Sequence, residues 1–267
     1  MRFKLQTNTR WLRVPATIQK ERLDILLVQL GLAPTRQQAQ ALILAGSVRV
    51  AGQLAGKAGT RLPVNARVEV AGPRMPYASR GGLKLEGALE DFGVDVTGKI
   101  CADIGSSNGG FTDCLLQRGA ARVYAVDVTT SQLDWKLQQD ARVRQVKCNA
   151  RYLRAEDIGE PVAIVTMDVS FISAAKILPA AAQIADEGAE FLILVKPQFE
   201  LEKRDVGKGG IVRDGELHER AIQRVWQAAE GVGLRPLKSA PSRVTGAGGN
   251  QEFFIHARKG TRDSIPV

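Results

Sequence analysis

The chain has 267 residues, of which 44% are hydrophobic, so it can bury a substantial core as one large domain or two unequal ones. No apolar run approaches the roughly 18 residues of a membrane span, and the first residues lack the apolar core of a secretory signal. The three cysteines form no CxxC pair, which argues against a disulfide framework and against a zinc site. We therefore expect a cytoplasmic protein that binds no metal and does not enter the membrane.

The basic charge lies in the first part of the chain. Residues 1–80 contain 13 Lys and Arg against 3 Asp and Glu, whereas the remainder contains 24 against 25, so the two parts carry +10 and −1. Residues 1–20 contain no acidic residue and form either a basic tail or a short organellar transit peptide. A local basic surplus of this kind favours a polyanionic partner.

Residues 21–72 predict a small α+β domain. A helix begins near Arg22, breaks at Gly31–Pro34 and is followed by a second helix that Thr35 caps and Gly46 ends. Two short strands follow, SVRV and RVEV. We expect Leu42, Ile43, Val48 and Val50 to pack inside and the neighbouring polar side chains to share an exposed surface.

This segment resembles the S4-type RNA-binding domain, through RLD at 22–24, TRQQA at 35–39 and ILAGSVRVAG at 43–52. The resemblance implies contact with the phosphate backbone of RNA rather than reading of bases, in agreement with the basic surplus. The expected RNA-binding residues are Arg22, Arg36, Gln37, Gln40 and Arg49.

After a linker at 73–79, helices and strands alternate through residues 80–260, and 261–267 form a C-terminal tail. This order predicts an α/β domain with a Rossmann-like, mostly parallel sheet. The expected helices are 80–92, 111–118, 174–185 and 215–233, and the expected strands are 99–104, 123–128, 144–148, 162–168, 191–196 and a final pair that ends in EFFIHARK. The last strand is expected to run antiparallel to the others.

A glycine-rich turn follows the first strand of this domain, in CADIGSSNGGFTD. Its spacing departs from GxGxxG, and Asp127 closes the next strand, where a carboxylate can accept hydrogen bonds from ribose hydroxyls. With no glycine placed for a pyrophosphate, the turn favours S-adenosylmethionine over NAD. Asn149 is equally well explained as a turn residue. The predicted cofactor contacts are Asp103, Gly105, Ser106, Gly109, Gly110, Phe111, Asp127, Val128, Asn149 and Asp168.

Four charged residues are expected at the same edge of the sheet. Asp168 and Lys196 close two parallel strands, so they should face the cofactor. Glu252 begins the antiparallel strand and therefore lies at that edge too, and Lys84 lies on the helix before the first strand. Lys84, Asp168, Lys196 and Glu252 are the candidate catalytic residues.

From Tyr77 to Arg258 the chain resembles the FtsJ-like 2'-O-ribose methyltransferases, and among them the TlyA family of rRNA methyltransferases, a family also called hemolysin A. The matching segments are SRGGLKL, DIGSSNGGFTD, QLDWKLQQDARV, NARYL, DVSFIS, LVKPQFE, VGKGGIVRD and GNQEFF. The resemblance implies methylation of ribose 2'-hydroxyls in RNA, with rRNA in ribosomal subunits as partner and a cytidine as target. Lys196 would act as base or hydroxyl orienter, helped by Lys84, while Asp168 and Glu252 would hold the lysines.

Three alternatives stay open. A non-catalytic RNA-binding protein is disfavoured by the intact set of four charged residues. A pseudouridine synthase would explain the leading domain but not the glycine-rich turn. A pore-forming hemolysin is suggested by the family's second name alone, and the sequence has neither a membrane span nor a barrel pattern.

Overall fold

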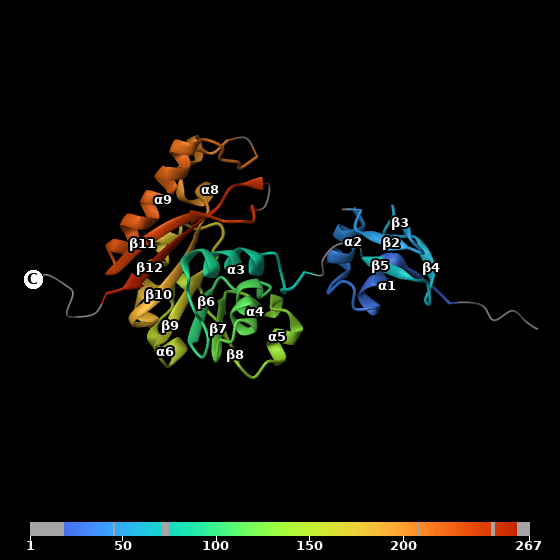
Figure 1. The fold of residues 1–267 in the computed structure, drawn as a ribbon, viewed down its shortest axis with the longest axis horizontal. Helices are drawn as coiled ribbons and strands as arrows, with labels where there is room; N and C mark the ends of the chain where they lie inside the picture. The colour runs from blue at the N-terminus through green and yellow to red at the C-terminus, as the bar shows by residue number, and fades with distance from the viewer. Residues whose placement is uncertain (1–18, 45, 71–74, 208, 247–248, 261–267) are drawn as a thin grey trace, which may run out of the picture. The chain divides into compact units, whose positions relative to one another are not determined.

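The computed structural model describes residues 19–44, 46–70, 75–207, 209–246 and 249–260 (Figure 1). The chain divides into two compact units, Met1–Arg74 and Met75–Val267. Each unit has its own sheets and its own core, so each is described by itself. None of the helices in the described ranges combines the length and apolar character needed to cross a membrane.

The described residues of the small unit form two helices and two small sheets. Its elements are β1 (Lys20–Arg22), α1 (Leu23–Gln29), α2 (Arg36–Leu44), β2 (Val48–Val50), β3 (Gln53–Leu54), β4 (Arg61–Pro63) and β5 (Val68–Val70). The order is β3-β2-β5 in one sheet, and β1 pairs with β4. The Thr35 hydroxyl accepts the backbone N–H of Gln38 at 3.2 Å, which confirms the predicted cap.

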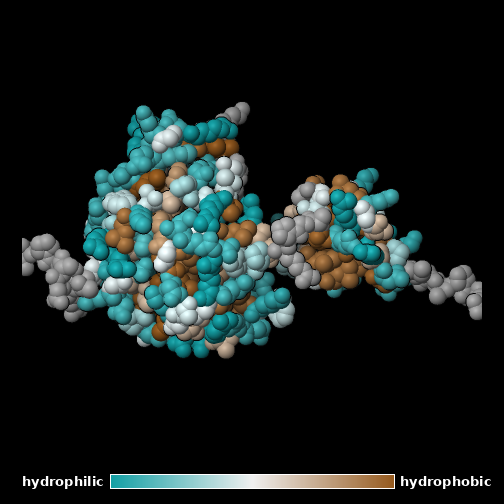
Figure 2. All heavy atoms as spheres, in the orientation of Figure 1, coloured by the Kyte–Doolittle hydropathy of each residue, from teal (hydrophilic) through white to brown (hydrophobic). Residues whose placement is uncertain are grey.

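Both predicted helices and both predicted strands are confirmed, and the structure adds that VRV pairs with VEV. The strands β1 (KER), β3 (QL) and β4 (RLP) were not predicted, because they lack the alternation of β-branched and polar residues that VRV and VEV have. Ile43 and Val48 are buried with Leu23, Leu27, Ala33 and Ala39, while Leu42 and Val50 pack half-buried against them. In the view of Figure 2 this unit shows a broad hydrophobic area, in keeping with its small core.

The large unit is built on a seven-stranded sheet in the order β11-β12-β10-β9-β6-β7-β8. Its strands are β6 (Ile100–Ile104), β7 (Arg122–Asp127), β8 (Val143–Lys147), β9 (Val162–Met167), β10 (Ala185–Val195), β11 (Leu234–Pro241) and β12 (Phe253–Lys259). Strands β8, β7, β6, β9 and β10 pair in parallel, and β12 pairs antiparallel to β10 and to β11. The predicted antiparallel last strand is therefore confirmed.

Helices cover both faces of this sheet. They are α3 (Gly81–Phe92), α4 (Gly110–Gln117), α5 (Trp135–Gln139), α6 (Ala155–Ile158), α7 (Leu178–Ile184), α8 (Pro197–Glu200) and α9 (Gly215–Glu230). Successive β6 residues face opposite cores: Cys101 packs with α3 and α4, and Ala102 packs with α7 and α9. Figure 1 shows α9 beside β11, and α3 and α4 near β6 and β7.

Most predicted boundaries lie within three residues of the observed ones, and two regions differ more. Strand β10 begins at Ala185, six residues before the expected start, and its register with β9 shifts between Ala185 and Glu190. The acidic and glycine residues there hide the strand pattern. At the other boundary, Tyr77 from the predicted linker is buried in the core with α3 and α4, and its hydroxyl donates to Glu86 at 2.9 Å.

Candidate active site

A cavity of about 600 Å³ lies where the strands β6, β9 and β10 end and β12 begins. All four predicted catalytic residues line it: Lys84, Asp168, Lys196 and Glu252. The carboxyl ends of parallel strands meet at one edge of a sheet, so residues that are distant in sequence meet there. This volume is within the usual range of small-molecule sites.

Lys196 is held by residues that follow β9. Its ammonium nitrogen lies 2.5 Å from Asp168 Oδ1 and donates to the hydroxyl of Ser170 at 2.8 Å. The Lys196 side chain is 9% exposed and that of Asp168 23% exposed, so the pair reaches the cavity while most of its surface is covered by protein. Burial and two contacts fix the position of this amine.

Lys84 makes the second ion pair. It lies on α3 and donates to Glu252 Oε2 at 2.6 Å, and the side chains are 11% and 3% exposed. A Cβ at Gly246 would lie 2.1 Å from Glu252 Oε1, so only glycine leaves room for this carboxylate. The four predicted residues thus form two lysine–carboxylate pairs in one cavity.

The glycine-rich turn after β6 packs against Asp168, just after the end of β9. Gly105 has φ +86°, and a Cβ there would lie 2.4 Å from the backbone oxygen of Asp168. The glycine was predicted to let the backbone approach a ligand; the structure adds that it lets the turn approach Asp168. Asp127 accepts the N–H groups of Ser107 and Thr129, both at 3.0 Å, and so ties the turn to the end of β7.

Asp103 does not reach the cavity. Its side chain is fully buried and accepts hydrogen bonds from the hydroxyls of Thr112 at 2.6 Å and Thr166 at 3.3 Å. Burial raises the pKa of this carboxyl to about 7, and the hydrogen bond from Thr112 opposes that rise. Asp103 therefore supports β6, α4 and β9 from inside, instead of contacting a ligand as predicted.

The remaining predicted cofactor residues divide into two groups. Gly105, Ser106, Gly110, Phe111 and Asp168 line the cavity. Gly109, Asp127, Val128 and Asn149 lie outside its lining. Val128 is exposed just after β7, and the Asn149 side chain caps a short 3-10 helix by accepting the N–H of Arg151. This contact agrees with the alternative prediction that Asn149 is a turn residue.

Sequence reasoning missed several residues of the cavity. They include Ser79, Arg80, Ser170, Phe171, Gln198, Phe199 and Asn250. All seven lie inside the matched segments SRGGLKL, DVSFIS, LVKPQFE and GNQEFF, so position within a segment was the available signal. Asn250 also accepts the N–H of Val212 and donates to the Gly210 carbonyl, which braces the VGKGG segment beside the cavity.

The predicted RNA-binding residues lie on the small unit. Arg22, Arg36, Gln37 and Arg49 are partly or fully exposed. Gln40 is half-buried and donates to the buried carboxylate of Asp24, as do Arg22 and Arg36. Gln40 was expected on the exposed surface, and the structure instead turns its amide inward.

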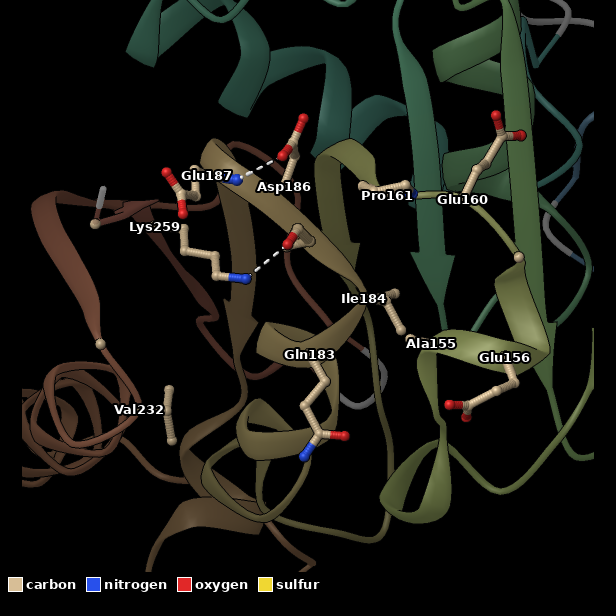
Figure 3. Close-up of a pocket in the computed structure, with 14 residues that line it drawn as sticks. Ala155, Glu156, Glu160, Pro161, Gln183, Ile184, Asp186, Glu187, Val232 and Lys259 are labelled. Carbon is tan, nitrogen blue, oxygen red and sulfur yellow. Dashed lines mark hydrogen bonds between the residues drawn. The ribbon is translucent and has the colours of Figure 1, made fainter. Parts of the chain in front are cut away.

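A second cavity, of about 690 Å³, lies near the amino ends of β9 and β10 (Figure 3). Glu156, Glu160, Asp186 and Glu187 give it an acidic rim, and the Lys259 ammonium is occupied by the carbonyls of Ala182 and Ala185. It contains none of the predicted site residues. Across the described ranges, no three His, Cys, Asp or Glu side chains are grouped to hold a metal ion.

Comparison with known proteins gives one family match for each of the two units. The FtsJ-like methyltransferase family model matches residues 77–259, and the S4 domain model matches residues 21–68. A Bacillus subtilis protein, YqxC, whose name gives rRNA methylation as a suspected activity, is 47% identical over 90% of this chain and 86% of its own length. The 16S/23S rRNA (cytidine-2'-O)-methyltransferase TlyA of Mycobacterium tuberculosis is 44% identical over 91% of both chains. A solved structure from Streptococcus thermophilus, named as a hemolysin, has a TM-score of 0.73 and 42% identity over 91% of this chain and 90% of its own.

Proposed function

Since the chain belongs to the FtsJ-like methyltransferase family and carries an S4 domain, we propose that it methylates a ribose 2'-hydroxyl in ribosomal RNA. The observation that carries this proposal is the pair of lysine–carboxylate contacts in one cavity, Lys196 with Asp168 and Lys84 with Glu252. The name of the M. tuberculosis relative supports cytidine as the target.

The methyl donor is S-adenosylmethionine, which supplies a methyl group on a positively charged sulfur. The residues present fit this group. The Asp168 carboxylate offers an anionic partner to a cation, and Phe111 offers an apolar wall. A carboxylate accepts about four hydrogen bonds. Asp127 uses two of them on Ser107 and Thr129, so it can also accept ribose hydroxyls.

Lys196 places the substrate hydroxyl and takes its proton. A ribose hydroxyl is a weak nucleophile, so it needs a fixed position and a proton acceptor. An ammonium group has three donors, of which Asp168 and Ser170 engage two. The third position remains for the substrate oxygen, and in the neutral amine it is the lone pair that accepts the proton.

Lys84 and Glu252 complete the charge balance. Each partner in this buried pair neutralises the other, so Lys84 supports the site by contact and position more than as a free cation beside Lys196. The family resemblance implied that Lys84 helps Lys196, and the pairing with Glu252 means that Lys84 does not do so as an unpaired cation. The alternating charges keep the cavity close to neutral before the cofactor and RNA enter.

The small unit supplies affinity for RNA. Arg22, Arg36 and Arg49 place guanidinium groups on its surface, which suits phosphate contacts that carry no sequence information. Such contacts release counterions and make binding depend on salt.

The decisive experiment uses S-adenosylmethionine with a labelled methyl group and purified ribosomal subunits. Label should appear in rRNA, and mapping of 2'-O-methyl marks should place it on cytidine. Label on a base instead of a ribose, or transfer to protein alone, would contradict the proposal. The Lys196→Ala variant provides the matched blank.

A further inference from the structure

A buried carboxylate lies beneath the basic surface of the small unit. The side chain of Asp24, on α1, is fully buried. Its two oxygens accept Nε and Nη2 of Arg22, each at 3.0 Å, in a bidentate pair. One of them, Oδ2, also accepts Nε of Arg36 and the amide of Gln40, both at 2.9 Å. One carboxylate thus joins β1, α1 and α2 through three side chains.

The guanidinium groups of Arg22 and Arg36 donate to Asp24 and are also partly exposed to solvent. Their side chains are 37% and 55% exposed, although the carboxylate they share is not exposed at all. Among the described residues, the Nη groups of Arg36 have no hydrogen-bond partner, so they are available to a ligand. A Cβ at Gly59 would lie 3.3 Å from Arg22 Nη1, so the backbone there also packs against this guanidinium.

This arrangement sets two physical effects against each other. A long arginine side chain loses rotamer freedom when it binds a phosphate, and a partner that fixes it beforehand lowers that cost. A negative charge near phosphates, by contrast, weakens their attraction to the surface. The hydrogen bond from Arg22 holds the pKa of Asp24 well below its ordinary value, so the carboxylate is charged at neutral pH.

We propose that Asp24 is a positioning residue for RNA binding, which fixes the guanidinium groups of Arg22 and Arg36 side by side to meet the RNA phosphate backbone. The proposal rests on the proposed function, in which these arginines contact RNA. Fixing the arginines in advance should strengthen RNA binding, whereas the negative charge of Asp24 should weaken it. A variant without that charge therefore shows which effect is larger.

The test compares Asp24→Asn with Glu69→Gln in the full chain, by binding to a labelled 16S rRNA transcript over a range of salt concentrations. Each variant removes one negative charge from the small unit. Glu69 pairs with Arg67 at 2.6 Å, but that pair is on the surface, with side chains 45% and 82% exposed. If only the net charge mattered, both variants would bind RNA at least as tightly as the wild type. We expect Asp24→Asn to bind several-fold more weakly, and Glu69→Gln not to. Equal behaviour of the two variants would overturn the proposal.

The double variant Arg22→Ala/Arg36→Ala separates this proposal from the proposed function. If it binds RNA as the wild type does, the assignment of these arginines to RNA fails. If it binds weakly while Asp24→Asn binds normally, only the positioning role fails. Introducing Asp24→Asn into the double variant should cause no further loss, because residues that act through one another are not additive.

Circular dichroism establishes whether Asp24→Asn is folded. If it is not, the side-chain Nε–H signals of the wild-type protein decide by NMR. Those of Arg22 and Arg36 should exchange with water more slowly than that of Arg49, whose guanidinium donates through Nη1, and not through Nε, to the Gly52 carbonyl. Exchange as fast as that of Arg49 would contradict the proposal.

Discussion

The ammonium of Lys196 lies 2.5 Å from Asp168 Oδ1, where two adjacent parallel strands, β10 and β9, come to their ends. Gly105 approaches the backbone oxygen of the same aspartate from the glycine-rich turn after β6. The Lys196 amine and the glycine-rich turn therefore both pack against one residue, Asp168. A change at Asp168 should disturb both.

Lys196→Ala should abolish methyl transfer while cofactor binding is nearly retained. Loss of a positioned proton acceptor costs on the order of 10² to 10⁴ in rate, and loss of orientation adds to this. Label incorporation into rRNA and calorimetry with S-adenosylmethionine measure the two properties. Lys203→Ala, at an exposed lysine, is the control and should keep full activity. Wild-type rates in Lys196→Ala would show that another group handles the proton.

Lys84→Ala should destabilise the large unit more than the double variant Lys84→Met/Glu252→Gln does. Removing one partner of a buried ion pair leaves a buried charge unpaired, at a cost of about 3 to 5 kcal/mol. The side chains here are 11% and 3% exposed, so that penalty applies. Urea unfolding of the three proteins measures it. A double variant that is destabilised as much as Lys84→Ala, or more, would contradict the pairing.

Asp127→Ala should weaken binding of S-adenosylmethionine. The carboxylate fixes the N–H groups of Ser107 and Thr129, and its remaining lone pairs are free for ribose hydroxyls. Calorimetry should show a higher dissociation constant, whereas Glu156→Ala, at an exposed acidic residue on α6, should match the wild type. Unchanged affinity in Asp127→Ala would place the ribose elsewhere.

Removal of residues 1–74 should reduce both RNA affinity and its dependence on salt. Residues 1–74 carry 12 of the chain's 37 Lys and Arg residues and only 3 of its 28 Asp and Glu residues. Counterion release scales with the number of phosphates contacted, so the slope of log K against log salt should become shallower. Filter binding of an rRNA transcript at several salt concentrations gives the slope. The truncated protein should still bind S-adenosylmethionine, and an unchanged salt slope would count against the small unit as the RNA anchor.

The stability of the large unit should fall as the pH rises from about 4 to about 7, through Asp103. Burial raises the pKa of this carboxyl from 3.8 to about 7, so across that window the folded state holds a proton that the unfolded state releases. Proton uptake by the folded state means that stability is greatest at the acidic end and is lost as Asp103 ionises. Asp103→Asn cannot ionise and should flatten the change. Thermal unfolding midpoints measured across the window test this, and an equal slope in the variant would contradict it.

The candidate site could be predicted from the sequence where position along a strand decides it. Asp168, Lys196 and Glu252 each stand at a strand end, and the order of parallel strands places such ends at one edge. Contacts between side chains could not be predicted in this way. The sequence does not indicate that Asp103 points into the core, or that Gly105 serves Asp168 by giving it room.

By itself the sequence determined the alternation of helices and strands, the two units with their unequal charge and the four residues that meet in the cavity. These follow from hydrophobic period, turn residues and chain order, which are local or topological properties. The tertiary structure decided which lysine pairs with which carboxylate, that Ser170 supports Lys196, and that Asp24 collects Arg22, Arg36 and Gln40. The reason is that a hydrogen bond depends on distances of a few tenths of an ångström between side chains from different elements, and only the packing of those elements fixes such distances.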